Sequence, residues 1–238
     1  MIIDAVIKAN PNTVVVLQTG NAVDMPWKDR AAAIVESWYS GNVGGRVIAE
    51  VLSGKVNPSG RLPITFYANI EQTPHPELPG FGTPMNTPTM IHYHEGAEVG
   101  YRWLALSGEK PNYAFGHGLS YTTFDYKDLK VSGGTTVRAS FTVTNTGNRS
   151  GADVPQLYLT DVAGEKRMRL LGFERIELKP GESKRIEIIS DPRLLARFDG
   201  KIRQWHIVEG SYRLAVGKSA NDLALISDTN LKKRLFSK

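Results

Sequence analysis

The sequence predicts a partial α/β layer of the parallel-sheet type, followed by an all-β sandwich of the immunoglobulin or fibronectin type III kind. Continuous apolar runs occupy the first 66 residues, whereas apolar residues in the second half alternate with polar ones. A proline-rich stretch lies between the two patterns. We therefore divide the chain into an α/β part at 1–66, a linker or loop at 67–117 and a sandwich domain at 118–238.

The first part is expected to contain a helix, two strands and a second helix, in that order. Residues 2–7 place apolar side chains at helical spacing. Residues 13–17 form a continuous β-branched run, which is typical of a strand buried on both faces of a parallel sheet. Residues 31–38 are interpreted as the second strand, and residues 47–52 follow a glycine-rich turn with helical periodicity.

The α/β layer is expected to be incomplete and to lead into an irregular segment. Residues 61–66 are expected to form a short edge segment, because a proline within them cannot donate a hydrogen bond to a sheet. Sheets of this class usually contain about five or six strands, so two strands indicate part of a domain. Residues 67–92 contain five prolines and are expected to wrap over a surface without forming a core.

The second half shows the pattern of an antiparallel sandwich. Apolar and polar residues alternate within residues 137–144, 156–159, 184–189 and 210–217, and clusters of glycine, asparagine and proline separate these runs. Several short strands with regular turns are typical of immunoglobulin-like domains. Three large apolar residues are expected to pack in cores: Trp38, Phe198 and Trp205.

Composition excludes several classes of protein and leaves the compartment open. The chain has 41% hydrophobic residues, no cysteine and a net charge of +5, with short basic clusters such as residues 166–169. A disulfide framework and thiolate metal sites are excluded, and neither a nucleic-acid partner nor a membrane span is expected. The first residues lack the basic and apolar regions of a signal peptide, so a periplasmic, secreted or cytoplasmic parent protein all stay open.

Three ordered groups of motifs extend the interpretation beyond fold class. The first group comprises residues 9–17, 26–27, 37–41 and 57–66, including NPSGRLPITF; the second comprises 95–96, 99–103 and 115–124, including VGYRW and FGHGLSYTTF; the third comprises 143–147, 156–159, 171–174 and 178–183. In this order they closely resemble the C-terminal half of glycoside hydrolase family 3 β-glucosidases. The resemblance covers residues 5–221.

The resemblance implies a retaining hydrolase of β-glycosidic bonds. In that family a barrel domain carries an aspartate nucleophile and an α/β sandwich domain often supplies the acid/base glutamate, with the two carboxyl groups about 5–5.5 Å apart. Neither carboxylate can be carried over to a residue of this sequence, so no catalytic residue is assigned and the isolated chain is expected to be inactive. A β-glucoside or oligosaccharide would bind only with the barrel; no cofactor is expected, and a homodimer stays open.

Two other classes of function are kept beside the enzyme interpretation. The chain could be a non-catalytic module that binds carbohydrate or a partner protein. It could also be a truncated product, in which case exposed sheet edges and apolar faces predict poor solubility.

Four residues of the second motif group are candidates for sugar binding: His94, Glu95, Tyr101 and Arg102. Glu95 is alternatively expected to anchor the linker to the α/β layer through hydrogen bonds. Tyr101 and Arg102, with the following tryptophan, combine rings and a bidentate donor, although packing between domains is the favoured interpretation.

Three further patterns are given no function. His92 and His94 lie two apart, but no third ligand is suggested nearby and zinc requires at least three protein ligands, so no metal is expected. The glycines at 41, 44 and 45 miss the spacing of a phosphate loop. The glycosylation sequon that begins at Asn148 is attributed to chance.

Overall fold

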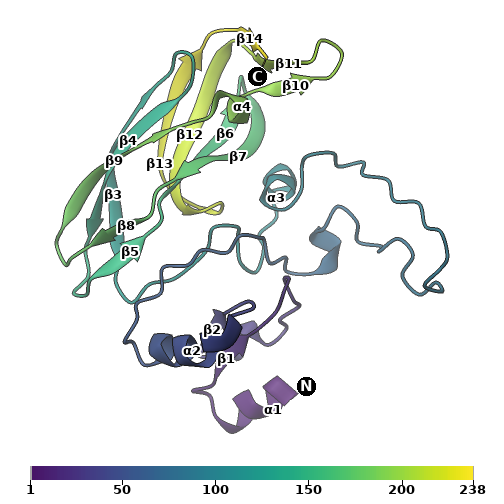
Figure 1. The fold of residues 1–238 in the computed structure, drawn as a ribbon, viewed down its shortest axis with the longest axis vertical. Coiled ribbons are helices and arrows are strands. Elements are labelled where there is room, and N and C mark those ends of the chain that lie inside the picture. The colour runs from purple at the N-terminus through teal and green to yellow at the C-terminus, as the bar shows by residue number, and fades with distance from the viewer. Residues whose placement is uncertain (1, 238) are drawn as a thin grey trace.

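The computed structural model describes residues 2–237, which fold into a small α/β part, an extended segment and a β-sandwich. Figure 1 shows the α/β part, in purple and dark blue, below the sandwich, in teal, green and yellow; the segment between them extends to one side. The predicted fold class is confirmed. No helix within residues 2–237 is long and apolar enough to cross a bilayer.

The α/β part follows the predicted order of elements. Helix α1 (Ile2–Ala9) precedes strand β1 (Val14–Leu17), and β1 pairs in parallel with β2 (Ala33–Glu36), followed by helix α2 (Gly44–Leu52). Two single 3₁₀ turns, η1 (Lys28–Arg30) and η2 (Gly41–Val43), lie around β2. The chain between β1 and β2, which includes η1, is the crossover connection that two parallel strands require.

The expectation that the first strand is buried on both faces is wrong. Val15 is 9% exposed, whereas Val14 is 41% exposed. Within the described residues the parallel sheet has two strands, so little chain is available to cover its second face. The core of this part is accordingly small and centres on Met25, Trp27 and Phe66, with Trp38 partly buried against it as predicted.

The segment after α2, which was expected to be an irregular linker, contains a β-bridge, a 3₁₀ turn and a helix. Residues 61–66 form no strand, but Phe66 makes an isolated bridge with Tyr113. A 3₁₀ turn η3 (Ile70–Gln72) and helix α3 (Tyr101–Ser107) follow, and the sequence did not predict α3. Its two ends are set by Gly100 and Gly108, which have positive φ angles of 60° and 77°. The division into residues 1–66, 67–117 and 118–238 stays a prediction.

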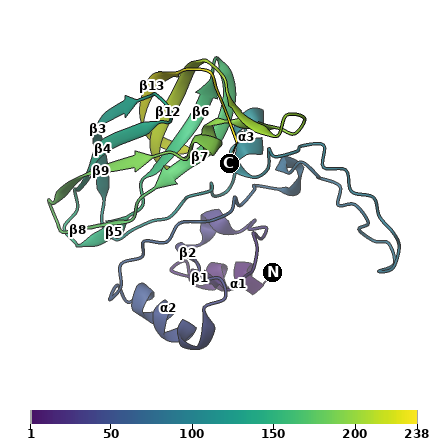
Figure 2. The same cartoon turned by 45° about the horizontal axis from the view of Figure 1, so that its top comes forward.

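The sandwich contains two main antiparallel sheets. Their strand orders are β13-β12-β6-β7 and β3-β4-β9, and two small sheets, β5-β8 and β10-β11-β14, complete the domain. The elements are β3 (Phe124–Ser132), β4 (Arg138–Asn145), β5 (Gly151–Asp153), β6 (Gln156–Val162), β7 (Glu165–Phe173), β8 (Ile176–Leu178), β9 (Ser183–Ile189), helix α4 (Pro192–Leu195), β10 (Arg197–Asp199), β11 (Gln204–Ile207), β12 (Gly210–Ser219), β13 (Asp222–Leu231) and β14 (Arg234–Phe236). Figure 2 shows the main sheets facing each other.

Alternation along the strands builds the main core. Phe141, Leu157 and Leu214 are fully buried between the two main sheets, as the period of two predicts. Trp205 packs partly buried against this core. Phe198 does not, since it is 54% exposed. It lies on β10 in the small outer sheet, where its ring contacts that of Trp205 at a centroid distance of 5.3 Å.

Candidate functional site

Glu95 lies in a cluster with two histidines. Its side chain is 3% exposed, and its Oε2 lies 3.1 Å from Nε2 of His75 and 3.9 Å from Nδ1 of His94. Hydrogen bonds from its own backbone N–H and from His75, with the charges of the two histidines, lower the pKa of Glu95 despite partial desolvation. The carboxylate is therefore ionised at neutral pH and ties residues twenty positions apart into one loop.

This arrangement corrects part of the reasoning from sequence. His75, and not His92, supplies the additional ligand-type group beside His94 and Glu95, and one ligand atom from each of the three lies within 4.8 Å of the others. Three such groups are the minimum for zinc. His75 and Glu95 already bond each other directly, so the contacts describe a hydrogen-bonded anchor within the segment 67–117. The expected anchoring onto the α/β layer is not among these contacts.

Tyr101 connects α3 to the sandwich. Its ring stacks on Phe115 at a centroid distance of 4.6 Å, and its hydroxyl accepts a hydrogen bond from the backbone N–H of Leu170 at 3.0 Å. The ring of Tyr158 lies at an angle of 71° to that of Tyr101, with the two centroids 6.2 Å apart. These contacts favour the packing interpretation of Tyr101, and sugar binding by His94, Glu95, Tyr101 and Arg102 stays a prediction.

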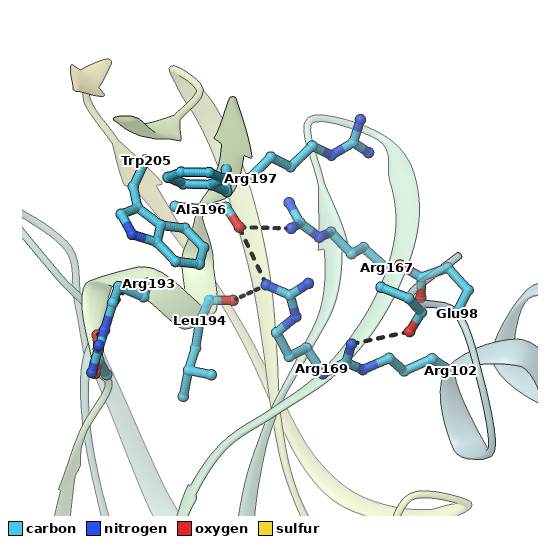
Figure 3. A pocket seen from close by; sticks show the side chains of 12 residues that line it. Glu98, Arg102, Arg167, Arg169, Arg193, Leu194, Ala196, Arg197 and Trp205 are labelled. Carbon is cyan, nitrogen blue, oxygen red and sulfur yellow. Dashed lines mark hydrogen bonds and ion pairs between the residues drawn. The ribbon is translucent and has the colours of Figure 1, made fainter. Parts of the chain in front are cut away.

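Arg102 points from α3 toward a pocket that the sequence did not reveal (Figure 3). The guanidinium of Arg102 donates to the carbonyl of Ala97 at 3.2 Å and lies 5.9 Å from the ring centroid of Tyr101. We call the pocket beside it, of about 600 Å³, the arginine pocket. Its lining residues are Ala97, Glu98, Arg102, Arg167, Arg169, Asp191, Arg193, Leu194, Ala196, Arg197, Phe198 and Trp205.

Two arginines of β7 form the half-buried wall of the arginine pocket. Arg167 donates to the carbonyl of Ala196 at 2.9 Å, and Arg169 donates to the carbonyls of Leu194 at 3.1 Å and Ala196 at 3.2 Å. Both therefore hold the end of α4 through backbone oxygens. Burial, together with the charge of Arg169, lowers the pKa of Arg167 to about 10. Burial also lowers the pKa of Arg169.

Arg102 was a candidate from its sequence motif alone, whereas Arg167 and Arg169, which line the same pocket, were not. Arg167 and Arg169 were visible as part of a basic cluster, and their spacing of two on a strand predicts that they share one face. Nothing local connects that face with α3, some sixty residues earlier. His75 gave no signal either, because it lies in an irregular segment.

Comparisons with known proteins identify the two parts of the chain. Residues 1–121 match the family described as Glycosyl hydrolase family 3 C-terminal domain, and residues 153–220 match the Fibronectin type III-like domain. The fold, and the order of the two matching domains along the chain, are thus those of the C-terminal portion of a family 3 glycosidase.

Individual proteins similar to this chain are β-glucosidases. Beta-glucosidase B of Emericella nidulans is 42% identical over 93% of this chain, and Thermostable beta-glucosidase B of Acetivibrio thermocellus is 36% identical over 94%. The chain superimposes with a TM-score of 0.87 on a beta-glucosidase from Bifidobacterium adolescentis, at 35% identity over 97% of this chain and 34% of that one. The same score and identity apply to beta-glucosidase 3B from Thermotoga neapolitana in complex with glucose, over 97% of this chain and 33% of that one.

The chain belongs to glycoside hydrolase family 3. It spans 28% of the Emericella protein and 30% of the Acetivibrio protein. Since residues 1–121 match the C-terminal domain of the family, the chain corresponds to the C-terminal portion of the β-glucosidases that it matches.

Proposed function

We propose that this chain works as the scaffolding rear part of a retaining β-glucosidase and completes one wall of its substrate cleft. The observation that carries the proposal is the coverage: nearly all of this chain matches β-glucosidases, but it spans less than a third of the first two relatives. The substrate would be a terminal β-D-glucosyl residue, by analogy with the names of those relatives.

The chain alone is expected not to hydrolyse glycosides. Retaining hydrolysis needs a nucleophile and an acid on opposite sides of the glycosidic bond, about 5–5.5 Å apart. The motifs of this chain carry neither residue. Without both groups held in position, most of the rate enhancement is lost.

A complementation assay tests the proposal. The pure chain, the barrel-bearing front part of a family 3 β-glucosidase, and their mixture would each be incubated with an aryl β-glucoside. We expect turnover from the mixture and none from either piece alone. Turnover by the pure chain would contradict its predicted inactivity, and a mixture that binds tightly yet stays inactive would contradict the scaffolding role.

A non-catalytic carbohydrate- or protein-binding module is the second candidate. The arginine pocket favours it, because the pocket combines guanidinium donors with aromatic rings. Retention of the chain on insoluble glucans, without any gain of hydrolysis from the added barrel, would favour this candidate over the enzyme interpretation.

A further inference from the structure

The arginine pocket holds more positive than negative charge. Five arginines and two acids line it, which leaves a net charge of +3 (five minus two). Asp191 pairs with Arg193, and among residues 2–237 no carboxylate oxygen lies within 4.0 Å of the side-chain nitrogens of Arg102, Arg167, Arg169 or Arg197. An adjacent pocket shares Arg167 and Arg197 and adds two glutamates, which do not form such pairs either. Four guanidiniums thus line a shared space without forming an ion pair among the described residues, and the one other acid of the pocket, Glu98, acts on Arg167 and Arg169 through its charge alone.

Hydrogen bonding leaves most of the donors on two of these arginines available. A guanidinium has five N–H donors in a planar fork. Arg167 and Arg169 give three hydrogen bonds between them, and both donate to the same carbonyl oxygen, of Ala196. This shared acceptor holds the two cations near each other. An oxyanion placed beside them would relieve their repulsion and accept the remaining N–H groups in a bidentate manner.

The opposite part of the pocket is aromatic. Phe198, 54% exposed, and Trp205 line the pocket from β10 and β11, with their ring centroids 5.3 Å apart. Figure 3 shows Trp205 and the fork of Arg169 on either side of the Leu194 and Ala196 backbone. An aromatic face offers apolar area to the C–H face of a pyranose ring. Pockets of about 300–1,000 Å³ suit small ligands, and this one has about 600 Å³.

We propose that the arginine pocket binds a sugar that carries an oxyanion, with the anion on Arg167 and Arg169 and the sugar ring against Trp205. A carboxylate on the sugar and a phosphate on the sugar share this chemistry. The inference concerns binding alone and does not depend on the proposed hydrolysis.

Calorimetric titration of the 238-residue chain at low ionic strength tests the site. Glucuronate and glucose 6-phosphate are the probes for the two sources of the anion, glucose is the neutral twin, and acetate and inorganic phosphate are the anions without a sugar. We expect one or both charged sugars to bind, more tightly than their sugarless anions, while glucose does not bind at the same concentration. Raising the salt concentration should weaken the binding, since solvent-accessible charges are screened.

Three variants localise the binding. Arg169→Gln should weaken it about tenfold or more, because a hydrogen bond between charged groups is lost. Arg197→Gln should weaken it about two- to fivefold, as expected for an exposed charge; the Arg197 side chain makes no hydrogen bond to the described residues, so this variant keeps the fold. The matched control Arg185→Gln removes the same charge from β9, outside the pocket.

Each negative result has a defined meaning. Equal titration curves for glucose and for both charged sugars would overturn the site, as would an Arg185→Gln effect as large as those of the pocket variants. Charged sugars that bind no tighter than acetate and phosphate would overturn the role of the aromatic wall. If Arg169→Gln fails to fold by circular dichroism, unchanged binding in Arg197→Gln refutes the proposal.

Discussion

Asp153 is the residue whose loss should most weaken the junction between the α/β part and the sandwich. Its carboxylate is 2% exposed; Oδ1 lies 2.6 Å from the guanidinium of Arg61, and Oδ2 accepts a hydrogen bond from the hydroxyl of Tyr126 at 2.7 Å. Hydrogen bonds to a charged group contribute about 1.5–3 kcal/mol each, so two contribute about 3–6 kcal/mol. Breaking a buried ion pair costs about 3–5 kcal/mol. We expect Asp153→Ala to lower the free energy of unfolding by about 3–5 kcal/mol.

Urea unfolding followed by circular dichroism and tryptophan fluorescence measures this loss. The control is Glu187→Ala, which breaks an exposed pair with Arg138 and should cost less than about 1 kcal/mol. Adding Arg61→Met to Asp153→Ala should recover part of the loss, because the buried, uncompensated cation is then absent. An Asp153→Ala cost no larger than that of the control would refute the reasoning.

Three further predictions concern the segment before the sandwich. Tyr101→Phe keeps the ring stacking but removes the bond to the N–H of Leu170, and should cost about 1 kcal/mol in urea unfolding; no loss would contradict a packing role. Because the pKa of Glu95 is lowered, its stabilising contribution is present above the ordinary pKa of 4.5 and is lost as pH falls through the folded value. The protection factors of the amides near His75, corrected for the intrinsic exchange rate at each pH, should therefore fall on acidification of the unsubstituted chain, and Glu95→Gln should remove this pH dependence. Gly116→Ala places a Cβ 1.9 Å from Oε1 of the buried Gln156, at a backbone φ of +81°, and should lower the free energy of unfolding by more than about 1 kcal/mol. Thermal unfolding measures this loss, with Gly45→Ala as the control.

The sandwich can be predicted from local sequence, because the alternation of apolar and polar residues within one strand indicates which of its side chains are buried. Alternation in residues 137–144 is enough to place Phe141 inside, and no knowledge of the neighbouring strand is needed. Phe198 breaks the rule because its strand belongs to a small outer sheet, where one face meets solvent. Val14 is another exception. An entirely apolar strand predicts that both faces of its sheet are covered by other elements, but the sheet of β1 and β2 has only two strands among the described residues, and Val14 stays exposed.

Contacts between distant segments are the part that sequence could not predict. Helix α3 has seven residues, too few to be stable alone, so its stability depends on contacts such as that of Tyr101 with β7. The bond between His75 and Glu95 spans an irregular stretch with no periodicity. The arginine pocket combines Arg102 with Arg167 and Arg169, whose proximity follows only from how α3 lies against β7.

The junction itself relies on directional polar contacts. The side-chain amide of Asn57 donates to the carbonyl of Ser150 at 3.1 Å and accepts from the N–H of Tyr121 at 2.7 Å. Gln156 donates to the carbonyl of Gly116 at 3.1 Å. Hydrogen bonds weaken steeply when they are bent, so these contacts specify one orientation of the sandwich and not only its attachment.

The arginine pocket depends on that orientation, because Arg102 reaches it from α3 whereas Arg167 and Arg169 belong to the sandwich. Loosening the junction at Asp153 should therefore weaken the proposed binding of a charged sugar, although Asp153 does not line the pocket. Titration of Asp153→Ala, with Glu187→Ala as the control, measures this coupling under conditions where both remain folded. Unchanged affinity in Asp153→Ala would mean that the contacts of α3 with β7 hold the pocket together without the junction.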